Sequence, residues 1–315
     1  MKVLVVGGAG FIGEALIARL LRGADVAGQG PATQVTNLDQ RIGERPGDPR
    51  LRCIEGSIID RKMLGLGIAD GVDCVFHLAS VPSGAAEQDF ELGLKVNLTA
   101  TLELLEVLRL CGTAPRLVFA STIGVYGVPL PPVIDEDTVP LPTLSYGAQK
   151  LIGEYLVADY GRRGYVDGRS VRIPGIVARP PTTGMMSLFM SDLIRELSAG
   201  RSVVCPVAAA GMAWWMSRPC IVDNLLHAAA LAPATAAAQR TWQLPVQHLS
   251  IGAVVEAIAR LQGSEVLRRV RYEPDAALQA QFANLPPLHC PRSVAAGFRH
   301  DGSVEVLPRR ALEPV

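Results

Sequence analysis

Residues 5–13 read VVGGAGFIG, and they continue an apolar run that begins at Lys2. A short apolar run of this kind is typical of a strand buried inside a parallel sheet. Gly7, Gly10 and Gly13 follow with the spacing GxxGxxG, and the sequence beyond them has helical periodicity. Glycines at such a turn permit a tight reversal, let the backbone approach a pyrophosphate, and let the helix pack closely. The stretch therefore predicts a dinucleotide site at a helix N-terminus.

Asp39 ends a second apolar run, VTNLD at 35–39. A carboxylate at the end of the second strand can accept hydrogen bonds from both hydroxyls of an adenosine ribose, and it repels a 2′-phosphate. This position favours NAD over NADP as the cofactor. An ordinary loop aspartate is the alternative interpretation, and the nearby Arg41 weakens the preference for NAD.

The alternation of apolar runs and helical patterns continues to about residue 172. Strands are predicted at 2–6, 35–39, 51–56, 72–79, 116–122 and 168–177, and helices at 11–23, 60–70, 93–112 and 146–164. Near-continuous apolar strands separated by helices indicate a parallel sheet covered on both faces. We therefore predict an α/β fold, a Rossmann doubly wound parallel sheet with a smaller α+β C-terminal substrate domain.

The pattern changes beyond Pro180, where proline and alanine become more frequent. Residues 1–172 are predicted to form the NAD-binding Rossmann domain, and 173–315 mainly the substrate-binding domain. A segment near 217–245 is predicted to return and pack on the first domain. The tail beyond Phe298 has little periodicity, which predicts a loosely ordered end.

The charge balance and the cysteine content of the chain argue against several classes of function. Lys and Arg total 30, as do Asp and Glu, and this balance argues against a nucleic-acid surface and gives no reason to expect a membrane surface as partner. No run approaches the roughly 18 apolar residues of a membrane span. The six cysteines are scattered, without CxxC or Cys/His clusters, so we expect reduced thiols, no metal site and a cytoplasmic location.

Four stretches in this order resemble the extended short-chain dehydrogenase/reductase family: GGAGFIG (7–13), HLAS (77–80), ASTIGVYG (120–127) and SYGAQK (145–150). The resemblance implies catalysis by Thr122, Tyr146 and Lys150. It also implies that the cofactor is bound by Gly7, Gly10, Phe11, Ile12, Gly13, Asp39, Ser57, Ile58, Leu78, Ala79, Ser80, Asn97, Tyr146, Lys150, Pro174 and Val177. Ser57 departs from the family, which usually has an aspartate there.

The chemistry of the predicted triad can be argued independently. A free tyrosine titrates near pH 10 and is a poor base at neutral pH, but a nearby ammonium and the positive nicotinamide stabilise its phenolate. Four residues along a helix place Lys150 on the same face as Tyr146. Thr122 could then hold the reacting oxygen against the tyrosine. The alternatives are a helix-start tyrosine, a solvated lysine and a backbone-capping threonine.

The class of substrate is indicated by positions at which this sequence differs from other members of the family. Members that act on nucleotide sugars commonly carry an Asn where RIPGIVARP (172–180) has Gly175, which argues against such a substrate. The C-terminal stretches instead resemble a branch of sugar-acid dehydrogenases, the D-erythronate dehydrogenase type. This implies NAD-dependent oxidation at C2 of a small trihydroxy acid to a 2-oxo acid. Its carboxylate requires a cation, for which an arginine is suited.

The expected substrate-binding residues are Ser80, Thr122, Tyr146, Arg179, Ser217 and Arg218. Either arginine could bind the carboxylate, and the serines could instead cap backbone. Trp214 and Trp215 could line a pocket or pack in the core.

Two other functions remain open at this point, a nucleotide-sugar epimerase or dehydratase with tightly bound NAD and a non-catalytic NAD-binding regulator. The resemblance also implies a homodimer, formed through the helices at 97–112 and 146–162.

Overall fold

A computed structural model describes residues 1–43, 47–181 and 187–314. Its centre is a seven-stranded sheet in the order β3-β2-β1-β4-β5-β6-β9, in which every neighbouring pair is parallel. The strands are β1 (Lys2–Val6), β2 (Gln34–Asp39), β3 (Leu51–Glu55), β4 (Cys74–His77), β5 (Arg116–Thr122), β6 (Asp167–Ile173) and β9 (Thr241–Gln243). The order reverses between β1 and β4, where open parallel sheets bind ligands at the carboxyl ends of their strands.

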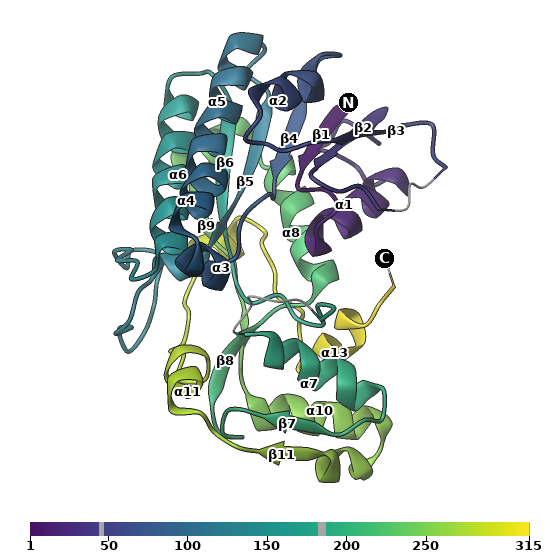
Figure 1. The fold of residues 1–315 in the computed structure, drawn as a ribbon, viewed down its shortest axis with the longest axis vertical. Coiled ribbons are helices and arrows are strands. Elements are labelled where there is room, and N and C mark those ends of the chain that lie inside the picture. The colour runs from purple at the N-terminus through teal and green to yellow at the C-terminus, as the bar shows by residue number, and fades with distance from the viewer. Residues whose placement is uncertain (44–46, 182–186, 315) are drawn as a thin grey trace.

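Helices cover both faces of this sheet (Figure 1). One face packs on α1 (Phe11–Leu21) and α8 (Arg218–Ala230), and the other on α2 (Arg61–Ile68), α5 (Ala100–Cys111) and α6 (Ser145–Arg162). Each of the two cores is lined by completely buried aliphatic side chains, such as Leu16 below one face and Leu104 below the other. The predicted doubly wound α/β architecture is therefore confirmed.

The predicted returning segment supplies both a helix and a strand to this sheet. Helix α8 packs against α1, and β9 joins the sheet beside β6. Two residues favour the start of α8. Ser217 caps the helix, because its Oγ accepts a hydrogen bond from Cys220 N. Pro219 lies in the first turn, where a backbone N–H has no partner within the helix, so its missing N–H costs nothing.

A smaller lobe lies below the sheet in Figure 1 and has its own core. Its elements are α7 (Leu188–Ser198), β7 (Val203–Cys205), β8 (Met212–Trp215), β10 (Gln247–Ser250), α10 (Ile251–Gln262), β11 (Val270–Tyr272), α11 (Ala276–Phe282) and α13 (Val306–Ala311). Strands β8 and β10 are antiparallel, whereas β7 and β11 are parallel. The remaining short elements are α3 (Ser83–Gln88), α4 (Phe90–Gly93), η1 (Leu94–Thr99), η2 (Ile123–Val125), α9 (Pro233–Ala238), η3 (Ser264–Arg269) and α12 (Pro291–Ala295).

The prediction of a loosely ordered tail is wrong. Helix α13 buries Leu307 in the core of the smaller lobe, and Arg310 pairs with Asp223 of α8 at 2.6 Å. Asp301 is buried as well, and it accepts hydrogen bonds from both the backbone and the hydroxyl of Ser217. This tail is ordered by its contacts with segments far away in the sequence. Its own periodicity does not reveal those contacts.

Candidate active site

The glycine turn after β1 is built as its spacing predicts. Gly7 has φ +86°, and a Cβ placed on it would lie 2.5 Å from the backbone nitrogen of Ala79. Glycine is therefore required there for both conformation and space. A Cβ on Gly13 would lie 2.3 Å from the carbonyl oxygen of Gly7, so α1 packs directly on the turn.

Helix α1 leaves its first N–H groups free, because no side chain of the described residues caps its N-terminus. Gly10, Phe11, Ile12 and Gly13 line a cavity at this point, of about 450 Å³. Uncapped N–H groups and the positive end of the helix dipole form an anion site. These residues therefore fit the pyrophosphate of a dinucleotide.

A second cavity adjoins the same turn and is lined by the carboxyl ends of β1, β2 and β4. Asp39 lies on it; one of its carboxylate oxygens accepts a hydrogen bond from Ala9 N at 2.9 Å and the other from Gln40 N at 2.7 Å. Each oxygen keeps a lone pair for a ribose hydroxyl. Arg41 lies on the wall of the same cavity.

The other predicted cofactor contacts on this side divide into two groups. Ile58, Leu78, Ala79 and Ser80 line the second cavity, whereas Ser57 and Asn97 do not. The Ser57 hydroxyl instead accepts a hydrogen bond from Ile59 N. Asn97 is completely buried, and its amide bonds both backbone groups of Val81 and the side chain of Gln149. Asn97 thus holds the loop after β4.

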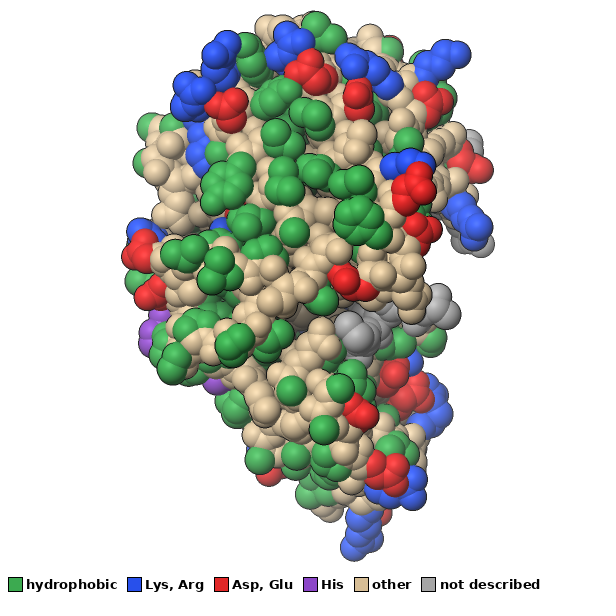
Figure 2. Space-filling model, turned by 60° about the vertical axis from the view of Figure 1, so that its left-hand side comes forward, with side chains coloured by type: hydrophobic (Ala, Val, Ile, Leu, Met, Phe, Trp, Pro, Cys, Tyr) green, Lys and Arg blue, Asp and Glu red, His purple; other side chains and the backbone are tan. Residues whose placement is uncertain are grey.

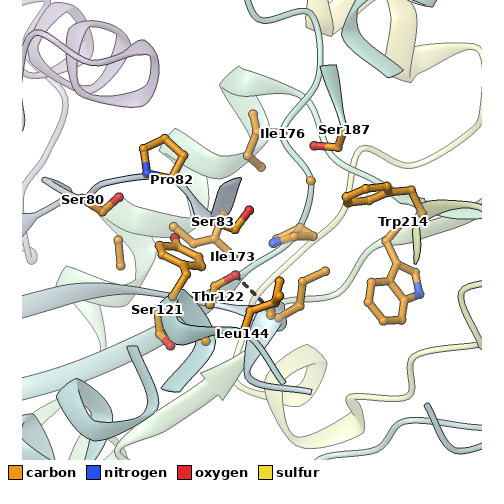
Figure 3. Close-up of a pocket in the computed structure, with 18 of the residues that line it drawn as sticks. Ser80, Pro82, Ser83, Ser121, Thr122, Leu144, Ile173, Ile176, Ser187 and Trp214 are labelled. Atoms are coloured by element: carbon orange, nitrogen blue, oxygen red, sulfur yellow. Dashed lines mark hydrogen bonds between the residues drawn. The ribbon is translucent and has the colours of Figure 1, made fainter. Parts of the chain in front are cut away.

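Thr122 and Tyr146 meet at the carboxyl end of β5. Thr122 ends this strand, and its hydroxyl accepts a hydrogen bond from Gly124 N at 3.0 Å, so its proton remains available to another partner. Burial raises the pKa of the Tyr146 phenol, whereas hydrogen bonds with Ser80 and Thr122 and the charge of Arg179 lower it. Figure 3 shows Ser80 and Thr122 on one side of the cavity, with Trp214 and Ser187 on the other.

Lys150 lies one turn along α6 from Tyr146 and is almost completely buried. Its ammonium is 4.8 Å from the ring centroid of Phe119 and 5.9 Å from that of Tyr146. Burial lowers the pKa of Lys150 to about 7. The ring faces favour its cationic form, and a cation here stabilises the phenolate of Tyr146.

His77 ends β4 within the buried region near this lysine. Its Nε2 lies 2.9 Å from Thr101 Oγ1, whose own proton is donated to the carbonyl of Asn97. Nε2 therefore carries the hydrogen, and the ring is neutral. Burial and the charge of Lys150 lower the pKa of His77 to about 3, so it has no acid–base role at neutral pH.

Arg179 brings a second cation to the site. Its Nε donates to the carbonyl of Ile176 at 3.0 Å, and its guanidinium carbon lies 5.2 Å from the ring centroid of Phe11. Ala178, immediately before it, has φ +59°, a left-handed conformation that alanine rarely adopts and that often marks functional sites. Burial lowers the pKa of Arg179, yet no carboxylate of the described ranges pairs with it. Arg179 lines the same cavity as Thr122 and Tyr146, and it brings there a guanidinium that no carboxylate of the described residues pairs with.

The model of the NAD dependent epimerase/dehydratase family matches residues 3–215. The chain belongs to this family. The expectation of an NAD-dependent enzyme is thereby confirmed, and the epimerase/dehydratase family is the one that the four stretches predicted.

The family relatives include two that span nearly the whole chain. A D-erythronate dehydrogenase of Cupriavidus necator is 39% identical over 99% of this chain and 98% of its own. A D-erythronate dehydrogenase of Haemophilus influenzae is 31% identical over 99% of both. A solved structure, the nucleoside-diphosphate-sugar epimerase of Agrobacterium tumefaciens, is 31% identical, has a TM-score of 0.90, and matches 98% of this chain and 92% of its own. Relatives named dehydrogenases over their full length support the dehydrogenase class.

Besides Ser57, Asn97 and the buried Lys150, three more predicted site residues do not line the cavities of this family member. Val177 is buried in the core of the smaller lobe, and Ile176, one residue earlier, lines the cavity with Pro174. Ser217 is completely buried, caps α8 and bonds Asp301. Arg218 lies near the turn, 4.7 Å from the Phe11 ring centroid, but it donates to the carbonyl of Glu313 and does not line the cavity.

Several cavity residues were missed by sequence reasoning. The cavity is also lined by Pro82, Ser83, Tyr126, Leu130, Thr143, Met190, Gln281, Phe282 and Leu285. Trp214 lines it too, whereas Trp215 points into the core, because successive side chains of a strand face opposite sides. For Tyr126 a signal existed, since it lies within ASTIGVYG. Gln281 and Phe282 of α11 come from the other lobe, and no local pattern marks them.

Two further observations concern membrane-spanning helices and metal sites. Among the described residues, no helix combines the length and apolar character needed to cross a membrane. No cluster of three or more His, Cys, Asp or Glu in the described ranges is arranged to hold a metal ion.

Proposed function

We propose that this protein oxidises the C2 hydroxyl of a small sugar acid, similar to D-erythronate, to a 2-oxo acid with NAD as the acceptor. The observation that carries the proposal is the guanidinium of Arg179, which lies in the cavity of Tyr146 and Thr122 and has no carboxylate partner among the described residues. A partly buried cation without an anion carries a desolvation cost, so a site that holds one favours an anionic ligand. A carboxylate next to the reacting hydroxyl meets this requirement.

The proposed roles of the residues follow from their positions. Arg179 binds the substrate carboxylate, and Thr122 and Ser80 hold the C2 oxygen near the phenol of Tyr146. The Tyr146 phenolate takes the proton of the C2 hydroxyl, and Lys150 stabilises that phenolate. Bound NAD⁺ supplies the acceptor of the C2 hydride, which leaves NADH and a carbonyl at C2. The first 172 residues and the segment 217–245 would bind NAD, and the remainder mainly the substrate.

The full-length relatives named D-erythronate dehydrogenase support this substrate class. The solved epimerase supports a rival, a nucleotide-sugar epimerase with tightly bound NAD. Gly175 argues against the rival, because this cavity residue offers no side-chain amide to a nucleotide sugar. A third possibility, a non-catalytic NAD-binding regulator, leaves the assembled Thr122–Tyr146 pair unexplained.

One experiment separates these functions. The purified protein is mixed with NAD⁺ and a panel of three- to six-carbon sugar acids, and the absorbance of NADH is followed. We expect turnover with a four-carbon acid and none with UDP-sugars. Conversion of a UDP-sugar without net NADH would overturn the proposal in favour of the epimerase. Binding of NAD without turnover of any compound would favour the regulator.

We also propose that the protein forms a homodimer and works in the cytoplasm. Leu110 of α5 and Ile152 and Tyr155 of α6 are 63%, 44% and 68% exposed. Figure 2 shows hydrophobic side chains gathered on the face that carries these helices. Exposed apolar side chains on adjacent helices form a self-complementary surface when two copies meet about a twofold axis. The balanced charge and scattered cysteines support a cytoplasmic location.

A further inference from the structure

A buried network of polar side chains lies beneath the cavity wall. Arg172 of β6 and Glu154 of α6 form an ion pair in which Nε contacts Oε1 at 2.9 Å and Nη2 contacts Oε2 at 2.7 Å. Their side chains are only 11% and 4% exposed. Ser121 donates its hydroxyl proton to the same Glu154, and Arg172 Nη1 donates to the phenol oxygen of Tyr126 at 2.7 Å.

Two of these four residues, Ser121 and Tyr126, line the cavity. Ser121 is paired in register with Arg172 across β5 and β6, and it directly precedes Thr122. Its proton is used by Glu154, so it contributes no donor to the cavity. Tyr126, in contrast, can contribute a donor to the cavity, because of its hydrogen bond with Arg172.

A guanidinium has only donor groups, so the Tyr126 oxygen must accept from Arg172. The phenol proton then has to be donated elsewhere, and the described part of the chain offers it no acceptor. Burial raises the pKa of Tyr126 above its ordinary value, which keeps the phenol protonated at neutral pH. The charge of Arg172 polarises the same O–H group, which strengthens it as a donor.

We propose that Tyr126 determines substrate specificity by donating a hydrogen bond to a hydroxyl oxygen, at C3 or C4, of the bound sugar acid. Arg172 and Glu154 are positioning residues, since they set the direction of the Tyr126 proton without touching the substrate. This inference rests on the proposed function, in which Arg179 binds the carboxylate and Tyr146 meets C2. A buried donor of this kind rejects analogues that lack its acceptor, because it is left unpaired.

The test compares Tyr126→Phe with the wild type on three substrates, the four-carbon trihydroxy acid and its 3-deoxy and 4-deoxy analogues. We expect kcat/KM for the full acid to fall about tenfold, the effect of one neutral hydrogen bond. For one of the two analogues, the variant and the wild type should be equal, because the accepting oxygen is absent. NAD affinity, measured by titration calorimetry, should not change.

An equal loss on all three substrates, or no loss on the full acid, would overturn the inference while the proposed function stands. A wild type that oxidises no sugar acid would overturn both. Tyr160→Phe is the matched control, since the Tyr160 hydroxyl bonds Glu106 outside the cavity. This control should keep the wild-type ratio of kcat/KM among the three substrates.

Arg172→Lys tests the positioning role. A lysine can keep the ion pair with Glu154, but its single nitrogen cannot reproduce the planar fork that also reaches Tyr126. We expect it to lose the same substrate discrimination as Tyr126→Phe. Retained discrimination in a folded Arg172→Lys variant would show that Arg172 does not orient the phenol. Tyr126→Phe leaves the ion pair intact, so it decides the specificity role even if the lysine variant does not fold.

Discussion

At the scale of single residues, burial and nearby charges shift the pKa values of the site in opposite directions. Burial raises the pKa of Tyr146 and lowers that of Lys150, so each change disfavours the charged form that catalysis uses. The charge of Arg179 and the hydrogen bonds from Ser80 and Thr122 act in the opposite direction on the tyrosine. The reactivity of the phenol is therefore set by its neighbours as a group.

Tyr146→Phe removes the proton acceptor and leaves the ring in place. We expect kcat for sugar-acid oxidation to fall by about 10²–10⁴, the usual effect of losing a general base. NAD should still bind with nearly unchanged affinity in a calorimetric titration, because the glycine turn is intact. Wild-type turnover by this variant would mean that another group is the base.

Arg179→Gln tests the second cation. The guanidinium lowers the pKa of the Tyr146 phenol, so its removal should raise that pKa. Oxidation requires the phenolate, and the rise of kcat with pH should therefore move to higher pH. The KM for the acid should also increase about 10–100-fold, because a charge-assisted hydrogen bond is lost.

The control for this pH profile is Arg268→Gln. Arg268 is 81% exposed in the smaller lobe and pairs with Glu265. Its pH profile and KM should match the wild type. An unchanged profile for Arg179→Gln as well would contradict the assigned place of Arg179.

At the scale of elements, the start of α6 is placed by direct contact with the turn after β5. A Cβ on Gly147 would lie 2.2 Å from the carbonyl oxygen of Gly124. Glu87 of the neighbouring α3 accepts a hydrogen bond from Ser145 N and supplies the negative charge that a helix N-terminus favours. Tyr146 is thus held between two elements that lie elsewhere in the sequence.

Gly147→Ala should push α6 away from this turn and separate Tyr146 from Thr122. We expect a loss of about 1–3 kcal/mol in the free energy of unfolding and a kcat at least about tenfold lower. Urea denaturation and steady-state kinetics measure the two effects. Gly65→Ala in α2 is the matched control: no atom lies within 4 Å of its added Cβ, so stability should rise by up to about 1 kcal/mol with unchanged kcat.

At the scale of the whole molecule, the cavity lies where the sheet meets the smaller lobe. The sheet provides the glycine turn and Thr122, helix α6 on the sheet provides Tyr146, and the smaller lobe provides Trp214 and Phe282. Trp214 also packs with Tyr126 and Ile134 in a separate cluster. The wall of this cavity therefore shares Trp214 and Tyr126 with the packing between the sheet and the smaller lobe.

Tyr155→Glu tests the proposed dimer. A charge in the middle of the apolar face of α5 and α6 should be buried on association and should shift the protein toward monomer. Sedimentation equilibrium of the two proteins measures this shift. Leu267→Glu, at a residue that is 49% exposed in the smaller lobe, should leave the association unchanged. A monomeric wild type would overturn the dimer itself.

Much of the fold was predictable because its signals are local. The strand runs, the helix that ends at Gly112 and the glycine turn all follow from neighbouring residues, and Gly112 indeed ends α5 with φ +72°. The turn η1, of π-helical form, interrupts the helix predicted at 93–112, and no sequence pattern indicated it. Asn97 within η1 holds the loop after β4, and its predicted contact with the cofactor stays a prediction.

Residue order alone specified the doubly wound sheet, the turn at Gly7 and the spacing of Tyr146 and Lys150. Each of these depends on conformational preferences and periodicities within a few residues. Tertiary packing gave different surroundings to side chains that look equivalent in the sequence. It buried Ser217 against Asp301, left Arg179 without an acid among the described residues, and turned the proton of Tyr126 away from Arg172. These outcomes arise between segments up to 84 residues apart, and no local pattern encodes such contacts.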